Sequence, residues 1–287
     1  AYEIAQCLVG SEMWIRDRIR IIIAAHKKYR MPEDKMYLPL HVGAEGKTDD
    51  SGKPLDLGYI KDNTGDNISE LNPSFCELTG IYWAWKNLDA KYIGLAHYRR
   101  HFCMKKKGKD PFDSILKYEE IKPYLGKIKV FVPNKRKYYI ESLYSHYKHT
   151  HYAWQLDETR RIISEKYPDY LKSYDKIVKR SYGYMFNMMI MEKEYLNQYC
   201  QWLFNILFEL QKMKNMPELS AFQNRFYGRV SEIIFNVWLD YQLESGNLKK
   251  EDIKEIKCIH IEKINWAKKI FAFLKAKFFS KKYNGSF

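Results

Sequence analysis

Three short runs of apolar residues lie at separate points of the chain, and they constrain its fold more than any other feature. The runs are IRIIIAA at residues 19–25, YIGLAHYRR at residues 92–100 and KIKVFVP at residues 127–133. Short apolar runs rich in β-branched residues are typical of parallel strands that are buried on both faces. The runs therefore predict the strands of a buried sheet.

Helical patterns separate and follow these strands. Within residues 73–87, Phe75, Leu78, Tyr82 and Trp85 recur at spacings of three and four residues, as one face of a helix requires. Beyond Ser142 the pattern is largely helical, and helices are predicted over residues 157–165, 194–213 and 231–243. One strand, predicted over residues 182–191, rejoins the sheet. Strand, helix and strand in this order predict an α/β fold with a mostly helical C-terminal half.

Composition narrows the class of protein and of partner. The 287 residues are 46% hydrophobic, enough for a large buried core, and the formal net charge of +14 implies anionic partners. Nucleic acid, phosphorylated small molecules and a membrane surface all fit this charge. The five cysteines are dispersed without a CxxC pair, which favours a reducing cytoplasm. No apolar run reaches the roughly 18 residues of a membrane span.

The two ends of the chain differ from its middle. Residues 1–18 hold a short apolar run with no basic residue before it and no small-residue cleavage pattern, so we expect a non-native or disordered appendage rather than a signal peptide. Residues 266–287 contain six lysines, no acidic residue and many aromatics, which predicts a basic amphipathic tail on an anionic membrane. A helix packed on the domain is the alternative. Residues 19–265 remain as a single domain.

The second apolar run delivers a cluster of cations and donors to the edge of the predicted sheet. The cluster consists of His97, Tyr98, Arg99 and Arg100. Ligands of open α/β sheets bind beyond the carboxyl ends of the strands. Arginine binds phosphate oxygens through two parallel hydrogen bonds, and histidine and tyrosine add further donors. The cluster therefore predicts a diphosphate-binding site, with an outward-facing salt-bridge patch as the alternative.

Several motifs together resemble a known family. They are MYLPLHVGAEGK, YIKDNTGDNIS, NPSFCELTGIYWAWKN, YIGLAHYRRHF, MFNMMIMEKEYLNQYCQWLFNIL and FYGRVSEIIFNVWL. Their combination is similar to a bacterial glycosyltransferase family that was long described as a domain of unknown function and occurs in capsular and exopolysaccharide gene clusters. The resemblance implies a GT-A-like, Rossmann-like nucleotide-sugar domain. It also implies transfer of a hexosyl group, often galactosyl or galactofuranosyl, from a UDP-sugar to a lipid-linked saccharide, at the inner face of the plasma membrane.

Under this resemblance, the polar stretch DNTGDNIS at residues 62–69 is a candidate sugar-binding loop. Carboxylate and amide side chains discriminate sugar epimers by pairing with their hydroxyls. The candidates are Asp62, Asn63, Asp66 and Asn67, with Trp83 or Trp85 as an apolar ring for a sugar face. The alternatives are a loop whose side chains bond only its own backbone, and tryptophans that pack in the core.

The cation cluster also bears on metal dependence. Most GT-A enzymes end the equivalent strand in Asp-x-Asp, which holds a divalent ion, whereas this chain has His-Tyr-Arg-Arg there. Two guanidinium groups can neutralise a diphosphate directly, so we expect that no cofactor is required. Mg²⁺ or Mn²⁺ bound through Asp62 and Asp66 is the alternative.

Candidates for proton transfer and for the remaining contacts are more scattered. Glu232 is predicted at a helix start, and Glu77 one turn into the central helix; either could deprotonate an acceptor hydroxyl. For Glu232 the alternative is a residue that only complements the helix dipole. Asn187 interrupts an apolar strand and is predicted to touch donor or acceptor. His26 follows the first strand and is predicted beside uracil and ribose, or else caps the strand.

The stretch SHYKHTHY gathers His146, His149 and His151, but no carboxylate or cysteine lies alongside, so a surface or acceptor-binding role is favoured over a zinc site.

Two further function classes stay open at this stage. Basic charge with interleaved aromatics also suits a nucleic-acid-binding module, although no such motif is present and we expect no nucleic-acid partner. A noncatalytic saccharide-binding protein is the third reading.

Overall fold

The computed structural model describes residues 18–213, 217–262 and 277. Of the predicted appendage at residues 1–18, all but Arg18 lies outside the described residues. The predicted tail at 266–287 lies outside them too, except for Lys277. Among the residues described, no helix is both long and apolar enough to cross a membrane.

One eight-stranded sheet organises the described chain, in the order β3-β2-β1-β4-β5-β10-β6-β9, and β9 also pairs with β4. The first four neighbours in this order are parallel, whereas β5 and β9 run antiparallel to β4. The strands are β1 Ile19–Ala25, β2 Tyr37–His41, β3 Ile60–Lys61, β4 Tyr92–His97, β5 Arg100–Cys103, β6 Val130–Pro133, β9 Met189–Glu192 and β10 Ile253–His260. The predicted α/β class is confirmed, and β2, β3, β5 and β10 join the four predicted strands of the sheet.

The isoleucine run of β1 explains why this strand is central. Ile21 and Ile23 face one hydrophobic core, and Ile22 and Ala24 face another on the opposite side of the sheet. Side chains alternate between the two faces of a strand, so a run without polar residues fits only a strand covered on both sides. Helix α3, Leu78–Asn87, covers the side of Ile22.

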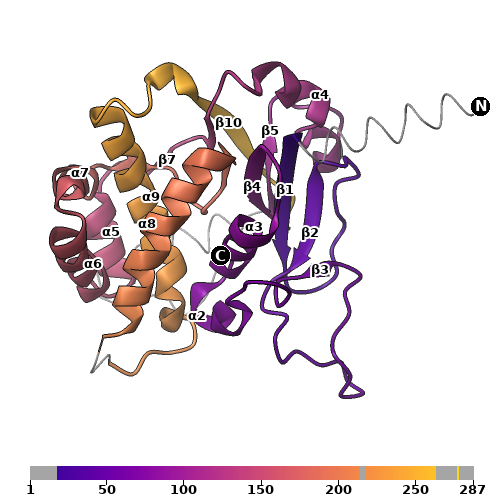
Figure 1. Cartoon of the computed structure of the whole chain (residues 1–287), viewed down its shortest axis with the longest axis horizontal. Coiled ribbons are helices and arrows are strands. Elements are labelled where there is room, and N and C mark those ends of the chain that lie inside the picture. The colour runs from indigo at the N-terminus through magenta and orange to yellow at the C-terminus, as the bar shows by residue number, and fades with distance from the viewer. Residues whose placement is uncertain (1–17, 214–216, 263–276, 278–287) are drawn as a thin grey trace, which may run out of the picture.

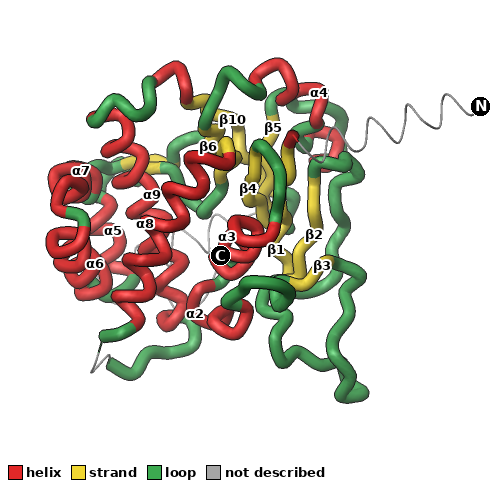
Figure 2. The backbone as a smooth tube through the Cα atoms, viewed as in Figure 1, coloured by secondary structure: helices red, strands yellow, loops and turns green. Residues whose placement is uncertain are grey.

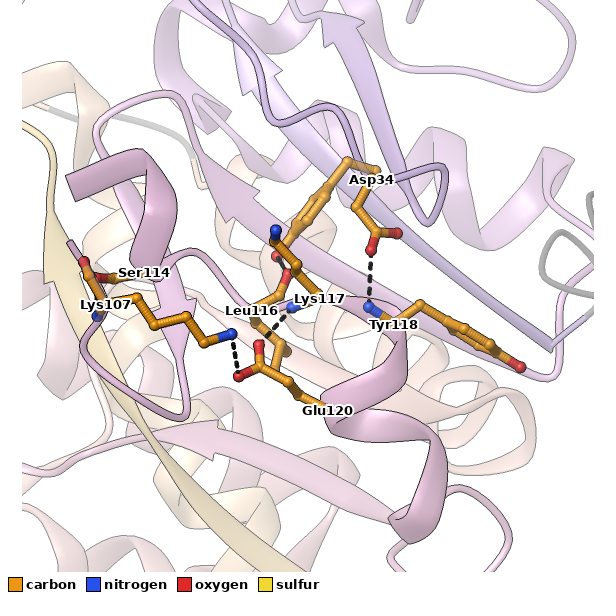
Figure 3. Close-up of polar contacts among 8 residues, drawn as sticks. Asp34, Lys107, Ser114, Leu116, Lys117, Tyr118 and Glu120 are labelled. Carbon is orange, nitrogen blue, oxygen red and sulfur yellow. Dashed lines mark hydrogen bonds and ion pairs between the residues drawn. The ribbon is translucent and has the colours of Figure 1, made fainter. Parts of the chain in front are cut away.

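The other face is covered by the segment between β5 and β6, which includes the short helix α4, Tyr118–Ile121. Figure 3 shows how polar contacts tie this segment down. The Asp34 carboxylate accepts a hydrogen bond from the backbone N–H of Tyr118 at 2.9 Å, and Glu120 forms an ion pair with Lys107 at 2.8 Å. These contacts lie far from the strand ends that carry the predicted site.

Helices dominate the second half of the chain and gather on one side of the molecule, beside the sheet (Figures 1 and 2). They are α5 Leu143–Thr150, α6 Trp154–Lys166, α7 Leu171–Ile177, α8 Lys193–Gln211 and α9 Phe226–Glu244. The three predicted helices correspond to α6, α8 and α9. Helix α9 begins at Phe226 rather than at Ser231, because Phe226 and Val230 continue its buried face.

Backbone breaks divide two of the predicted elements. The helix predicted over 73–87 is split into α2, Asn72–Phe75, and α3 by Cys76, which has a positive φ of 55°. The strand predicted over 182–191 is split into β8, Tyr182–Gly183, and β9 by Phe186 and Asn187, with φ of 75° and 52°. β8 pairs with β7, Arg136–Lys137, while β9 rejoins the sheet as predicted.

Candidate active site in a basic cleft

A cleft of about 940 Å³ opens at the carboxyl ends of the parallel strands. Ala24 of β1, His41 of β2 and His97 of β4 line it on the sheet side. Helices α5 and α9 and strand β7 supply the opposite wall. Parallel strands end at a common edge, where loops rather than regular elements present side chains to a ligand. The cleft is therefore where this fold is expected to bind a small molecule.

The cleft is strongly basic. Five arginines line it: Arg99, Arg100, Arg136, Arg225 and Arg229. Arg99 forms an ion pair with Glu262 at 3.3 Å. No ion pair within the described part of the chain joins any of the other four to a carboxylate. Among the described residues, the acidic side chains that line the cleft are Glu77 and Glu232.

Two of these arginines keep buried donors without partners in the described structure. Nε of Arg100 and Nη1 of Arg229 are both buried and make no hydrogen bond. The two guanidinium groups lie over the rings of Phe186 and Phe222, at 4.4 and 4.3 Å, and burial lowers the pKa of Arg229. A buried charged donor without an acceptor is costly. The arrangement is that of a site built for an anion.

All of the predicted diphosphate residues line this cleft, as does His26. The Nε2–H of His97 donates to the carbonyl of Phe186 at 2.5 Å, and burial lowers the pKa of His97, so its ring is neutral near pH 7. The Tyr98 ring stacks on Tyr29 at 3.8 Å and meets the edge of His26 at 5.3 Å. His97 thus fixes the neighbouring loop, while Tyr98 and His26 form an aromatic surface.

Glu77 and Glu232 form the acidic part of the cleft, and Asn187 links Glu77 to helix α9. The Asn187 side-chain amide donates to the Glu77 carboxylate at 2.7 Å and to the carbonyl of Gly228 at 2.9 Å, and its oxygen accepts from Ser231 at 2.7 Å. Asn187 is buried and is absent from the cleft lining. It therefore positions Glu77 rather than presenting itself to a ligand.

Burial raises the pKa of Glu232 to about 7, and the negative charge of Glu77 adds to the shift. Glu232 lies within α9, past its first turn, so the prediction that it opens a helix is wrong and the helix dipole is not its partner. A carboxyl group that titrates near neutral pH can accept a proton from a substrate and release it again. Glu77 precedes α3 directly rather than lying one turn inside it.

Arg136, Arg225 and Arg229 were not expected from the sequence. Arg225, Arg229 and Glu232 are spaced by four and three residues, which places them on one face of a helix that is otherwise largely apolar. That stripe of charge is the pattern that could have revealed them. Arg225 also donates from Nε to the sulfur of Cys76 at 3.0 Å, so the break between α2 and α3 lies at the cleft.

The predicted sugar-binding loop lies elsewhere. Asp62 is fully buried, and its carboxylate accepts hydrogen bonds from the backbone of Gly43 and Ala44 and from the hydroxyls of Ser69 and Thr79. Both of its oxygens are therefore used within the fold. Because Gly43 lines the cleft, Asp62 acts on the cleft only by ordering the loop that follows β2.

The other predicted sugar contacts are likewise absent from the cleft lining. Asn63 donates to Glu45 at 3.1 Å, Asp66 accepts from Tyr82 at 3.1 Å, and Asn67 bonds within its own loop. Trp83 is 6% exposed, and its indole N–H donates to Thr64 at 3.0 Å. Trp83 matches the alternative of a core tryptophan, whereas Asn63 and Asp66 bond to side chains outside the loop rather than to its own backbone. Both oxygens of Asp62 are thus occupied, whereas Asp66 is exposed and its second oxygen lies 3.8 Å from Lys86.

The histidine stretch contributes to the opposite wall. His146 and His151 line the cleft, and the buried carboxylate of Glu141 bonds to Nδ1 of His146 at 3.1 Å and of His149 at 2.5 Å. The expectation that no carboxylate lies alongside these histidines is therefore wrong. Burial lowers the pKa of His146 to about 4, so its ring is neutral in the working range. Within the described residues, no group of three or more His, Cys, Asp or Glu side chains is arranged to hold a metal ion.

Comparisons with known proteins agree with this geometry. A solved structure described as the apo form of WbbM, a bifunctional glycosyltransferase, is similar to the chain, with 28% identity and a TM-score of 0.74. The match covers 86% of this chain and 46% of that protein, so the chain spans less than half of its length. No curated protein sequence matches. The model of one protein family matches residues 20–243, well over half of the chain, so the chain belongs to the family described as Domain of unknown function (DUF4422).

Proposed function

We propose that this protein is a glycosyltransferase that moves a hexosyl group from a UDP-sugar to a lipid-linked saccharide in capsular or exopolysaccharide biosynthesis, with galactose or galactofuranose as the favoured sugar. The observation that carries the proposal is the pair of unpartnered arginine donors, on Arg100 and Arg229, in a cleft that also holds a carboxyl group titrating near pH 7. The similar solved protein is itself a glycosyltransferase.

The arginines of the cleft are the proposed binding site of the donor diphosphate. A UDP-sugar carries two negative charges on its diphosphate, and each guanidinium can donate two parallel hydrogen bonds to phosphate oxygens. Arg99 and Arg100 follow β4, and Arg225 and Arg229 approach from the α9 side. His26 and Tyr98 supply the adjoining aromatic surface, which suits uracil and ribose.

In the transfer step, the acceptor hydroxyl oxygen attacks the anomeric carbon as the bond from that carbon to the diphosphate oxygen breaks. The hydroxyl proton passes to the Glu232 carboxylate, and UDP leaves with its new negative charge held by the arginines. Glu77, positioned by Asn187, keeps the affinity of Glu232 for a proton high. A carboxylate that takes this proton is what inversion at the anomeric carbon requires.

No divalent ion is needed in this proposal, because fixed guanidinium charges take over its electrostatic role. We expect exhaustive chelation to leave turnover within about twofold of the untreated enzyme, since the loss of one bound ion would cost far more. The measurement is release of UDP from the donor before and after chelation. Loss of activity that Mn²⁺ restores would show that the arginines do not suffice.

A thermal-shift screen over nucleotide-sugars tests the proposed function. A ligand that binds only the native state raises its stability by mass action, so UDP-galactose and UDP-galactofuranose should raise the melting temperature, and GDP-mannose should raise it less. Random oligonucleotides provide the comparison for a nucleic-acid-binding protein. Stabilisation by oligonucleotides and by no nucleotide-sugar would contradict the proposal.

A further inference from the structure

Four large hydrophobic residues are exposed on the described surface: Ile60 at 43%, Tyr139 at 83%, Ile140 at 65% and Tyr182 at 39%. Three of them belong to the β7–β8 pair and the loop that follows β7, and we refer to Tyr139, Ile140 and Tyr182 as the rim patch. Ile60 lies in β3, at the other end of the sheet order.

The backbone holds the rim patch in place. Tyr139 adopts a left-handed conformation with φ of 58°, which is unfavourable for a bulky residue and requires support from its surroundings. The neighbouring backbone supplies that support: Tyr138 N–H donates to Ser181, Ile140 N–H to Tyr138 and Leu143 N–H to Arg180, each at 2.7 Å. The backbone hydrogen bonds of the fold therefore hold Tyr139 in its exposed position.

The rim patch lies on the outer side of a wall of the cleft. Arg136 and Tyr138 line the cleft, and the Tyr138 ring lies 4.3 Å from that of His146. Lys137 is exposed, as is Tyr139. In β7 this alternation is the one expected of a strand, and Tyr139 follows in a left-handed bend with its side chain exposed. One short segment thus presents a cleft wall on one side and an exposed aromatic on the other.

Positive charge surrounds the rim patch. Residues 135–141 and 179–182 contain five basic side chains and one acidic one, Glu141. Glu141 is buried against two histidines, and Lys135 and Arg180 are paired with Glu255 and Asp240. Among the ion pairs of the described residues, none involves the exposed Lys137 or Lys179. Aromatic and aliphatic side chains next to free lysines are typical of a surface that binds anionic lipid.

We propose that the rim patch rests on an anionic membrane surface, with Tyr139 and Ile140 among the lipid headgroups and Lys137 and Lys179 paired with lipid phosphates. This contact places the outer side of one cleft wall next to the bilayer. The idea that the protein would then meet an acceptor anchored in lipid rests on the proposed function, whereas the membrane contact itself does not.

Vesicle binding by the full chain tests the proposal. The probe is vesicles of phosphatidylethanolamine and phosphatidylglycerol, with phosphatidylcholine vesicles as the neutral comparison. The double variant Tyr139→Ser/Ile140→Ser should bind the anionic vesicles about tenfold more weakly than the wild type, because two interfacial side chains are lost. Lys137→Glu should weaken binding by more than about fivefold, the contribution of one lysine near anionic lipid.

Two matched variants serve as controls. Ile60→Ser removes the exposed hydrophobic residue of β3, and Lys53→Glu reverses an exposed lysine in the β2–β3 loop; both should bind vesicles as the wild type does. Equal binding by the rim variants and the controls would overturn the proposal, as would a wild type that does not prefer anionic vesicles.

Transfer of sugar to a soluble acceptor distinguishes failure of the membrane proposal from failure of the proposed function. The rim variants should keep wild-type transfer from a UDP-sugar to a short soluble saccharide, because they leave the cleft unchanged. If the wild type binds anionic vesicles through the rim patch but never transfers sugar, the proposed function fails and the membrane contact stands. If the rim variants lose soluble transfer and vesicle binding together, the patch is part of the folded cleft and the membrane proposal fails.

Discussion

Glu232 depends on its surroundings for its chemistry. It lies on α9, lines the cleft, and is close enough to Glu77 for that charge to act on it. Burial alone would raise the pKa of any carboxyl, and the second negative charge raises it further. A pKa near the working pH is what a group that must both take and release a proton needs.

Glu232→Gln should lower the rate of transfer by roughly 10²- to 10⁴-fold while leaving donor affinity nearly unchanged, because the amide keeps the shape but accepts no proton. For the wild type, the rate should rise with pH through about 7, where the Glu232 carboxylate forms. The measurement is a pH–rate profile with a donor titration at each pH. Equal rates for the two proteins would remove Glu232 from the mechanism.

The same substitution should change stability in a pH-dependent way. The pKa of Glu232 is raised in the folded state from 4.5 to about 7, so the unfolded chain gives up this proton first as pH rises. Between these two values the stability of the wild type should therefore fall relative to Glu232→Gln, by roughly 3 kcal/mol at the upper end. Urea denaturation at several pH values measures the difference. A constant difference would show that Glu232 is not buried as described.

Arg100→Lys and Arg229→Lys keep the charge of the cleft but remove the paired donors. Each should weaken binding of the donor by about 1 to 3 kcal/mol, the scale of a hydrogen bond to a charged group. Titration calorimetry with UDP-galactose measures this change. Arg161→Lys is the control, because Arg161 pairs with Glu158 and Glu165 on the exposed side of α6. If these variants lose no more donor affinity than the control does, the diphosphate binds elsewhere.

At the scale of elements, the loop after β2 depends on one buried carboxylate. Asp62→Asn should cost about 2 to 3 kcal/mol of folding free energy, because four donors converge on Asp62 and an amide cannot accept all of them. Asp66→Asn, in the same loop but exposed, should cost less than about 1 kcal/mol. Urea midpoints with turnover measured in parallel distinguish the roles. Normal stability with lost turnover in Asp62→Asn would restore the sugar-binding prediction.

Strand β4 requires a glycine where β9 crosses close to it. A Cβ atom at Gly94 would lie 2.9 Å from the carbonyl oxygen of Met189 and 2.8 Å from Ile190. Gly94→Ala should therefore destabilise the fold by about 1 to 3 kcal/mol, since backbone must move to make room. Thermal unfolding checks this expectation, and an unchanged melting temperature would contradict the β4–β9 pairing.

The elements show what local sequence can and cannot reveal. β1 and β4 were predictable because each is an apolar run between polar segments, and α8 because its apolar face repeats. The break at Cys76 and the breaks at Phe186 and Asn187 were not, since no glycine or proline marks these positive φ values. They are held by contacts with residues remote in sequence, such as the hydrogen bonds from Asn187 to Glu77 and Gly228.

At the scale of the whole molecule, the residues on one side of the cleft could be predicted from the sequence, whereas those on the other side could not. His97, Arg99 and Arg100 could be found because the end of an apolar strand must reach the sheet edge. Arg136 and Arg229 come from β7 and α9, and only the packing of the helical half brings them to that edge. The polar loop at residues 62–69 was misleading in the opposite sense, since its composition suits sugar binding but its contacts are internal.

The most direct test of the account is transfer of radiolabel from a UDP-sugar to acceptor lipid, measured for the wild type and Glu232→Gln beside donor binding by both. The account predicts that both proteins bind the donor with similar affinity and that only the wild type moves the label into the lipid fraction. Failure of both proteins to bind any UDP-sugar, or equal transfer by the two, would contradict it.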